Sequence, residues 1–278
     1  MSLSSAFGYE GKRVIVVGAA TGMGRATAEL ALDLGAEVTA MDYADFDLPG
    51  AKTQHVNLGD KASVEAALAT LNGQYDALFS AAGVADGTPN LGQINFVGHR
   101  HMINYMRAHG LFAPKSAIGM ISSAAGMGWE QALESILPIF EISDWDESVA
   151  WLQSTSKDNY MATKQVICAY VAREALALLK EGIRINAICP GPTDTPLAQA
   201  NKDLWLGFAA DYRAAAGNIP ASTPLDQAYP LVFLCSDAAR AITGTTTVSD
   251  VGYFSAGLSE SFPDATMIAR ALTGKLTF

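Results

Sequence analysis

Cysteine is scarce in this chain. Its 278 residues include only three cysteines, which are far apart and form no Cys-x-x-Cys motif. An odd number of separated cysteines does not suit a disulfide framework or a zinc site. We therefore expect reduced core thiols, a cytoplasmic protein and no metal site. The three residues are Cys168, Cys189 and Cys235.

Histidine is also rare, with four residues in the whole chain. None of them has the spacing to another histidine, with carboxylate support, that is typical of a metal site. We interpret all four as surface or helix-packing residues. They are His55, His99, His101 and His109.

Positive charge and long apolar runs are lacking as well. The 18 Lys and Arg residues against 28 Asp and Glu residues give a formal net charge of −10, so no basic patch is available for a nucleic-acid partner. No apolar stretch approaches the length that spans a bilayer, and the N-terminus shows no signal-peptide pattern. Half of the residues are hydrophobic, which suits one globular domain with a large core.

Strand and helix patterns alternate along the chain, which is typical of a doubly wound α/β fold. No repeat or clear linker interrupts them, so we interpret residues 1–278 as a single domain. We expect a seven-stranded parallel sheet with helices on both faces. The strands are expected near Arg13–Val17, Glu37–Met41, Thr53–Val56, Ala77–Ser80, Ser116–Ile121, Arg184–Ile188 and Thr245–Val248. The main helices are expected over Gly22–Leu34, Lys61–Leu71, Leu91–Ala108, Asn159–Lys180 and Leu225–Ser236.

A glycine-rich turn joins the first expected strand to the first helix. It runs from Gly18 to Gly24 and contains Thr21, Gly22 and Met23. Strand, glycine turn and helix together favour a phosphate-binding site. The glycines let the backbone approach a pyrophosphate, and the helix N-terminus offers free N–H groups and a positive dipole end. An ordinary tight turn is the alternative.

Tyr160 and Lys164 lie four residues apart at the start of a long helical pattern. This spacing is about one helical turn, so both side chains share a face. A cationic Lys beside a phenol favours the phenolate, and we expect Lys164 to lower the pKa of Tyr160. The pair would then exchange protons near neutral pH. A solvated Tyr and Lys on a helix face is the alternative.

Ser122 and Ser123 follow the fifth expected strand. A serine hydroxyl at that point can hydrogen-bond a substrate oxygen and stabilise the developing oxyanion. Adjacent residues that leave a strand point to opposite sides, so the two serines have different surroundings.

Several motifs occur together in the order found in one enzyme family. They are Gly18-x-x-x-Gly22-x-Gly24, Ser123, Tyr160-x-x-x-Lys164 and Pro190-Gly191. In this order they resemble the short-chain dehydrogenase/reductase family. The resemblance extends from about Gly11 to Gly252, and it implies a Rossmann fold and a nicotinamide cofactor.

The resemblance implies a role for each matching residue. Tyr160 is implied as the general acid/base, and Ser123 is implied as the serine that binds the substrate oxygen. Lys164 is implied to hold the nicotinamide ribose as well. Asn95 is implied to hold a water in a proton relay to Lys164, and an exposed helical Asn is the alternative. Thr195 is implied to contact the nicotinamide carboxamide.

Asp42 ends the second expected strand. A carboxylate there can accept both adenosine ribose hydroxyls and repel a 2′-phosphate. No Arg or Lys adjoins it, and the turn has no basic residue before Gly24, so we expect NAD rather than NADP. Asp45 and Asp47 are nearby alternatives.

Two positions depart from the family pattern. Asn57-Leu58 stands where the family has an Asp that contacts adenine, although an Asn amide oxygen can still accept the exocyclic amine. Ser80-Ala81-Ala82-Gly83 replaces the family's Asn-Asn-Ala-Gly, whose amides brace the central strands. The cofactor-binding candidates are Gly18, Thr21, Gly22, Met23, Gly24, Asp42, Asn57, Leu58, Ala82, Gly83, Tyr160, Lys164, Pro190 and Thr195.

Residues 127–156 form an insert that lengthens the usual connection between the serine and the tyrosine. Its pattern predicts two short amphipathic helices around Pro138. It begins at the carboxyl edge of a parallel strand, where open α/β sheets bind ligands, so we expect a substrate lid. A surface excursion and an interface element are the alternatives. The side chains expected to cover the pocket are Trp145 or Trp151, with Phe140 or Ile136.

The insert and the neighbouring motifs resemble the bacterial 3-alpha-hydroxysteroid dehydrogenase/carbonyl reductase branch. Coniferyl-alcohol dehydrogenases resemble the same branch. The resemblance implies an NAD-dependent oxidoreductase that interconverts a secondary alcohol and its carbonyl, with a ring-bearing steroid, terpenoid or aromatic substrate. An NAD-sensing binding protein without turnover is the alternative, although Ser123, Tyr160 and Lys164 argue against it. A homodimer or homotetramer is implied, through Leu91–Ala108 and Asn159–Lys180.

Overall fold

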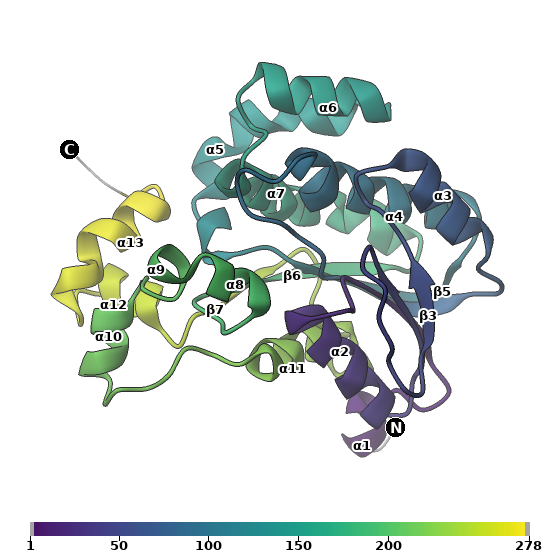
Figure 1. The fold of residues 1–278 in the computed structure, drawn as a ribbon, viewed down its shortest axis with the longest axis horizontal. Helices are drawn as coiled ribbons and strands as arrows, with labels where there is room; N and C mark the ends of the chain where they lie inside the picture. The colour runs from purple at the N-terminus through teal and green to yellow at the C-terminus, as the bar shows by residue number, and fades with distance from the viewer. Residues whose placement is uncertain (1–2, 276–278) are drawn as a thin grey trace.

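The computed structural model describes residues 3–275. A seven-stranded parallel sheet forms its centre, with the strand order β3-β2-β1-β4-β5-β6-β7 (Figure 1). The predicted fold class is therefore confirmed. The strands are β1 (Arg13–Val17), β2 (Glu37–Asp42), β3 (Lys52–His55), β4 (Tyr75–Ser80), β5 (Phe112–Ile121), β6 (Arg184–Pro190) and β7 (Thr246–Ser249).

Helices cover both faces of the sheet (Figure 1). One layer contains α3 (Lys61–Ala69), α4 (Gly98–Ala108) and α7 (Tyr160–Lys180), and the other contains α2 (Gly22–Asp33) and α11 (Pro224–Cys235). The central strands β1, β4 and β6 are mostly buried because each side of the sheet faces a helix layer.

Alternation along β1 divides the interior into two cores. Ile15 and Val17 belong to the core under α4 and α7, whereas Val14 and Val16 belong to the core under α2 and α11. All four side chains are at most 1% exposed, so the sheet is buried on both faces. The carboxyl ends of the strands remain as the edge where a site can form.

Two features of the helices were not predicted. The expected helix Leu91–Ala108 begins with a π-helical turn, η1 (Gln93–Val97), before α4. Short helices also follow β6 and β7, and a third core joins some of them around Tyr253 and Phe254.

The short helices that follow β6 or β7 are α8 (Pro196–Ala200), α9 (Lys202–Trp205), α10 (Ala210–Ala215), η4 (Asp237–Ala239), α12 (Tyr253–Leu258), η5 (Pro263–Ala265) and α13 (Thr266–Leu272). Two further short helices occur earlier in the chain, α1 (Leu3–Phe7) and η2 (Ala124–Gly126).

The insert forms α5 (Trp129–Ile136), a 3₁₀ turn η3 (Leu137–Glu141) and α6 (Trp145–Ser154). Two helices around Pro138 were therefore predicted correctly. Asp144 caps α6 by accepting the Glu147 N–H at 3.0 Å.

The packing of the insert differs from the predicted lid. Phe140 contacts Phe96 and Tyr170, with ring centroids 6.3 and 6.1 Å away. Ile136 is 1% exposed and Trp145 is 7% exposed, and both belong to the core of the α4–α7 layer. These side chains pack in the core of their own domain and are therefore not available to form a lid.

A buried arginine fixes this arrangement. Arg100 of α4 donates to the Ile139 carbonyl at 2.7 Å and to the Ser148 hydroxyl. Its side chain is 6% exposed, so these bonds replace the water that the guanidinium loses. The insert is therefore held to α4 by both apolar and polar contacts.

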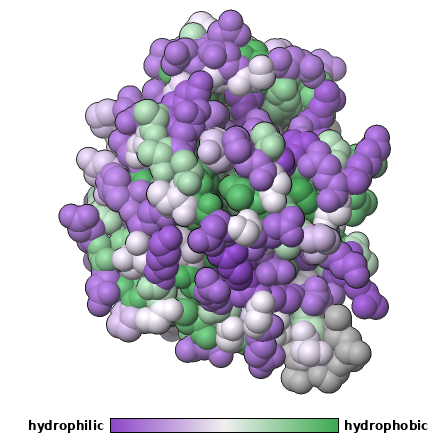
Figure 2. Space-filling view, turned by 90° about the vertical axis from the view of Figure 1, so that its right-hand side faces the viewer, coloured by the Kyte–Doolittle hydropathy of each residue, from purple (hydrophilic) through white to green (hydrophobic). Residues whose placement is uncertain are grey.

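The face shown in Figure 2 is mostly hydrophilic, with hydrophobic side chains only in small patches. Within residues 3–275, no helix is both long and apolar enough to cross a membrane.

Candidate active site

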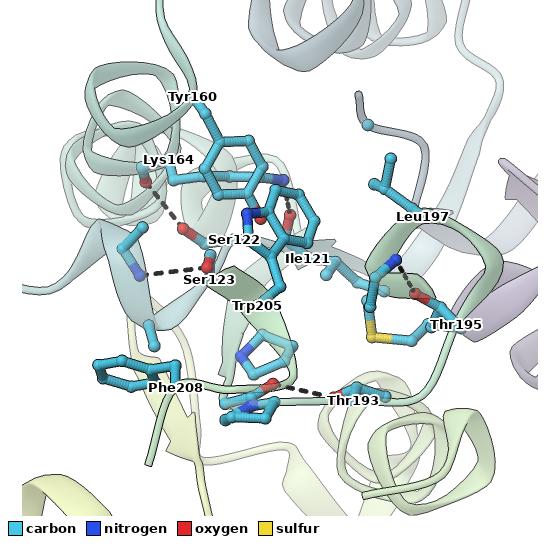
Figure 3. A pocket seen from close by; sticks show the side chains of 18 of the residues that line it. Ile121, Ser122, Ser123, Tyr160, Lys164, Thr193, Thr195, Leu197, Trp205 and Phe208 are labelled. Carbon is cyan, nitrogen blue, oxygen red and sulfur yellow. Dashed lines mark hydrogen bonds between the residues drawn. The ribbon is translucent and has the colours of Figure 1, made fainter. Parts of the chain in front are cut away.

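A cavity of about 360 Å³ opens at the carboxyl ends of β5 and β6 (Figure 3). Ser123 follows β5, and Pro190 ends β6. Tyr160 and Lys164 enter it from the first turns of α7. Topology therefore brings together residues that are far apart in the sequence.

The start of α7 positions Tyr160. Asn159 caps the helix by accepting the Ala162 N–H at 2.9 Å. Asp86 accepts the backbone N–H of Tyr160 at 2.7 Å. The first turn is therefore fixed by two side-chain acceptors, and the Tyr160 ring projects into the cavity (Figure 3).

Lys164 is 4% exposed, and its Nζ donates to the Ile121 carbonyl at 3.0 Å. The same Nζ lies 5.5 Å from the centroid of the Tyr160 ring. Burial lowers the pKa of Lys164 to about 8, because the charged form loses its hydration.

The predicted pKa shift of Tyr160 is corrected by the structure. Burial raises the pKa of the Tyr160 phenol, while the Ser123 hydroxyl opposes this and the Asp86 carboxylate adds to it. Desolvation of the phenol is the largest cause, so the net direction of the shift is upward.

The two serines have different surroundings. The Ser122 hydroxyl is 2% exposed and donates to the Lys164 carbonyl at 2.8 Å, so it connects β5 to α7. The Ser123 hydroxyl accepts the Ala125 N–H at 3.1 Å and faces the Tyr160 phenol, whose pKa its hydrogen bond lowers. This geometry favours Ser123 as the donor to a substrate oxygen.

Asn95 lies in the π-helical turn and is fully buried. Its amide pairs with the backbone of Val84, accepting the N–H at 2.8 Å and donating to the carbonyl at 3.1 Å. It also donates to Thr163 at 3.3 Å. These bonds fix the segment beside Gly83, and the water relay stays a prediction.

His99 is a buried helix-packing residue, as one of the two interpretations had it, and it also makes polar contacts that the sequence did not predict. It is 1% exposed, and its Nδ1 contacts the Ser80 hydroxyl while its Nε2 lies 3.0 Å from the Ala82 carbonyl. A carbonyl can only accept, so Nε2 carries the proton and Nδ1 accepts from Ser80. Burial lowers the pKa of His99 to about 4, so the imidazole is neutral. His99 therefore braces the segment where the family's asparagines are missing.

A second cavity, of about 520 Å³, lies over the glycine turn. Gly18 has φ +88°, and a Cβ there would come within 2.5 Å of the Ala82 nitrogen. A Cβ on Gly24 would come within 2.0 Å of the Gly18 carbonyl oxygen. Both positions therefore require glycine, and the N-terminus of α2 opens onto the cavity.

Most of the predicted cofactor residues line this second cavity, while Pro190, Tyr160 and Lys164 line the first. The residues of the second cavity are Gly18, Thr21, Gly22, Met23, Gly24, Asp42, Asn57, Leu58, Ala82, Gly83 and Thr195. Five residues line both cavities, so the two are continuous; these are Met23, Ala81, Gly83, Thr195 and Leu197.

The adenosine end of this cavity contains Asp42 and Asn57. The Asp42 carboxylate accepts the N–H groups of Ala20 at 2.9 Å and Ala44 at 3.0 Å, which orients it against the glycine turn. The Asn57 amide oxygen accepts the Gly59 N–H at 2.9 Å. Each of these oxygens retains a lone pair for a ligand.

The wall of the first cavity was missed from the sequence. It comes from α8, α9 and the C-terminal helix: Leu197, Leu204, Trp205, Phe208 and Leu272. Trp205 packs on Tyr160, with ring centroids 4.7 Å apart. No residue of 127–156 lines this cavity, so residues 196–208 take the place expected for the insert. The apolar residues after Thr195 were the available signal.

Comparisons with known proteins show which proteins this chain resembles. A family model described as enoyl-(acyl carrier protein) reductase matches residues 143–254. The cis-4-hydroxycyclohexanecarboxylate dehydrogenase of Sinomonas cyclohexanicum is 30% identical over 256 residues, covering 86% of this chain and 95% of that protein. The 3-alpha-hydroxysteroid dehydrogenase/carbonyl reductase of Comamonas testosteroni is 26% identical over 252 residues, covering 86% and 95%.

A solved structure shares the fold. The 3-alpha-hydroxysteroid dehydrogenase from Pseudomonas sp. B-0831, complexed with NADH, superposes with a TM-score of 0.68 at 21% identity, covering 90% of this chain and 99% of that one. The chain is an oxidoreductase and belongs to the short-chain dehydrogenase/reductase family, which uses nicotinamide cofactors. The predicted resemblance is confirmed.

Proposed function

We propose that the protein is an NAD-dependent dehydrogenase/reductase that interconverts a secondary alcohol and its carbonyl. One observation carries this proposal: Ser123, Tyr160 and Lys164 line a cavity that is continuous with the cavity over the glycine turn. A substrate carbon in the first cavity can therefore lie against a nicotinamide in the second.

The residues present fit the cofactor. Gly18 and Gly24 let the turn pack closely against Ala82 and against its own backbone, the N-terminus of α2 faces the second cavity and can bind a pyrophosphate, and Thr195 stands where the cavities meet. When bound, NAD supplies the hydride acceptor for alcohol oxidation.

The protein residues divide the remaining work. In the oxidising direction, Tyr160 takes the hydroxyl proton, and Ser123 donates a hydrogen bond to the same substrate oxygen. Lys164 provides positive charge behind Tyr160 and a donor toward the ribose. In the reducing direction, Tyr160 returns the proton to the carbonyl oxygen.

The substrate is a bulky, ring-bearing alcohol. Leu204, Trp205, Phe208 and Leu272 provide an apolar wall beside Tyr160. Burial of apolar area contributes about 25 cal/mol per Å², so a ring gains more from this wall than a short chain does.

A screen of NAD reduction across steroid, terpenoid and aromatic ring alcohols tests this function. Turnover of at least one ring alcohol, with less for short linear alcohols, is the expected result. An NAD-sensing binding protein is the alternative, and it would bind NAD without turning over any of them.

The cofactor preference depends on Asp42. Its carboxylate repels a 2′-phosphate, and Arg25, the nearby base in α2, is occupied by Glu29 and the Asp47 carbonyl, each at 2.6 Å. We expect tighter binding of NAD than of NADP, and Asp42→Ala should narrow the difference. Calorimetric titration of both cofactors measures this. Tighter binding of NADP by the wild type would contradict it.

The protein forms a homo-oligomer, as members of the family typically do. The insert covers part of the α4 and α7 surface through Arg100 and Phe140, so exposed residues beyond it carry the contact. Leu176 and Leu179 at the end of α7 are 66% and 49% exposed. Light scattering at micromolar concentration should report a dimer or tetramer, and a monomer would refute the assembly.

A further inference from the structure

We propose that the substrate cavity selects uncharged ring alcohols and rejects anionic ones, and that Asp86 sets this selection. The inference rests on the proposed function and specifies its substrate class. It follows from which charged side chains line the cavity and which nearby ones already have hydrogen-bond partners.

The cavity has very few charged groups. Among the residues that the structure describes around it, only Asp86 and Lys164 carry charge. The remaining lining is apolar or neutral. A carboxylate, phosphate or sulfate on a substrate therefore finds no cation on the wall that faces its ring.

Lys164 does not fill this role. It is 4% exposed, and its Nζ is held by the Ile121 carbonyl behind the Tyr160 ring. Its position beside Gly83 puts it on the cofactor side of the cavity: a Cβ on Gly83 would lie 3.3 Å from this Nζ. A substrate substituent on the opposite wall does not reach it.

The arginine that follows the wall segment already has hydrogen-bond partners as well. Arg213 of α10 donates to the Leu206 carbonyl at 2.6 Å and to the Phe208 carbonyl at 2.8 Å. These bonds hold the wall in place and direct the guanidinium at the backbone. Lys202 begins α9 but does not line the cavity.

Asp86 is an exposed residue that places a negative charge at the edge of the cavity. Its Oδ1 accepts the Tyr160 N–H at 2.7 Å, so the carboxylate is fixed at the first turn of α7. An anionic substrate would bring a second negative charge close to this carboxylate, and the repulsion between them would be screened by salt because Asp86 is exposed. A neutral substrate avoids this repulsion.

Comparison with a relative that is named for an anionic substrate identifies a compound with which the selection can be tested. The similar protein from Sinomonas cyclohexanicum is named for a hydroxycyclohexane that bears a carboxylate. The cavity described here accommodates the ring but offers the carboxylate no partner. We therefore expect the amide or methyl ester of that compound to be a better substrate than the acid.

A binding experiment tests the selection without requiring turnover. Calorimetry with the NAD-loaded protein compares cyclohexanecarboxamide with cyclohexanecarboxylate, which have the same ring and differ in charge. We expect the amide to bind at least about tenfold more tightly, with a difference that shrinks as salt increases. Equal affinities, or tighter binding of the carboxylate, would overturn the inference.

Asp86→Asn is the informative variant. An Asn side chain keeps an oxygen to accept the Tyr160 N–H, so the helix start is preserved while the charge is lost. We expect the preference for the amide to fall several-fold. Asp33→Asn is the matched control, because this exposed residue at the end of α2 lines neither cavity. A similar fall in both variants would refute the role of Asp86.

Kinetics then separates this inference from the proposed function. With cis-4-hydroxycyclohexanecarboxylate and its amide, kcat/KM should favour the amide, and Asp86→Asn should narrow the ratio. Asp86→Asn should also move the pH profile of oxidation to lower pH, because the carboxylate raises the pKa of Tyr160. Selective binding by a protein that turns over neither compound and none of the screened ring alcohols would refute the dehydrogenase function and leave the charge selection supported.

Discussion

Tyr160→Phe should lower kcat by about 10²–10⁴-fold, the range that general acid–base catalysis contributes, and leave NAD affinity nearly unchanged. Only the hydroxyl is lost, while the ring retains its packing against Trp205, 4.7 Å away. Steady-state kinetics with a ring alcohol and calorimetry with NAD measure the two quantities. The pattern of lost turnover and retained binding would assign the proton transfer to this hydroxyl.

Tyr229→Phe is the control for this substitution. Tyr229 lies on α11, is 54% exposed and lines neither cavity. Its loss of a hydroxyl should leave kcat unchanged. Wild-type turnover in Tyr160→Phe, or an equal loss in Tyr229→Phe, would rule out Tyr160 as the acid/base.

The pKa values explain why the site depends on Lys164. Burial raises the pKa of Tyr160, which disfavours the phenolate at neutral pH. Lys164, whose pKa burial lowers to about 8, is still largely protonated near neutrality, and its charge opposes the cost of a phenolate. Proton transfer from the alcohol therefore becomes easier as pH rises toward the pKa of Tyr160, while the help from Lys164 weakens above about 8.

The sheet and the glycine turn could be predicted because their signals are local. The central strands, such as β1, contain short apolar runs, and Gly18 and Gly24 are required by contacts within one turn and the adjoining strand end. The Tyr160–Lys164 spacing was readable for the same reason, since both residues belong to one helix.

The wall of the substrate cavity depends on contacts between distant segments, so it was not predicted. Leu272 reaches the cavity because α13 packs against the residues around Phe208, and Gly128 at the start of the insert closely approaches the Leu272 carbonyl. The insert was assigned to the cavity because it begins at the carboxyl edge of a parallel strand, and its aromatic residues were expected to cover the substrate. Phe140 instead packs against Phe96 and Tyr170, and Trp145 packs against His101.

His99 shows the same limit for a polar residue. The sequence shows that Ser80 and Ala81 stand where the family has asparagines. It does not show that His99 braces this segment in their place. His99 lies on α4 and reaches the end of β4 only because α4 packs over the sheet. The sequence signal for this role was a polar residue on a helix face that is otherwise apolar. Recognising it requires knowing which face of α4 packs against the sheet.

His99→Leu should destabilise the protein by about 1–3 kcal/mol for each polar group that it leaves buried without a partner. Those groups are the Ser80 hydroxyl and the Ala82 carbonyl. Because Ala82 lines the cofactor cavity, the affinity for NAD should fall as well. Chemical denaturation and calorimetry measure these effects. His109→Leu, at an exposed position stacked on Tyr105, is the control and should change stability by less than about 0.5 kcal/mol.

The acid dependence of stability provides a second measurement for His99. The folded protein holds this imidazole with a pKa of about 4, below the ordinary value of 6.5, so the unfolded chain binds the proton more readily. The contribution of His99 to stability is complete above pH 6.5 and is lost as the pH falls from 6.5 toward 4. The loss amounts to about 3 kcal/mol over this range. His99→Leu should remove that slope, whereas His109→Leu should keep it. An unchanged slope in His99→Leu would show that His99 is not the buried neutral group that links stability to pH.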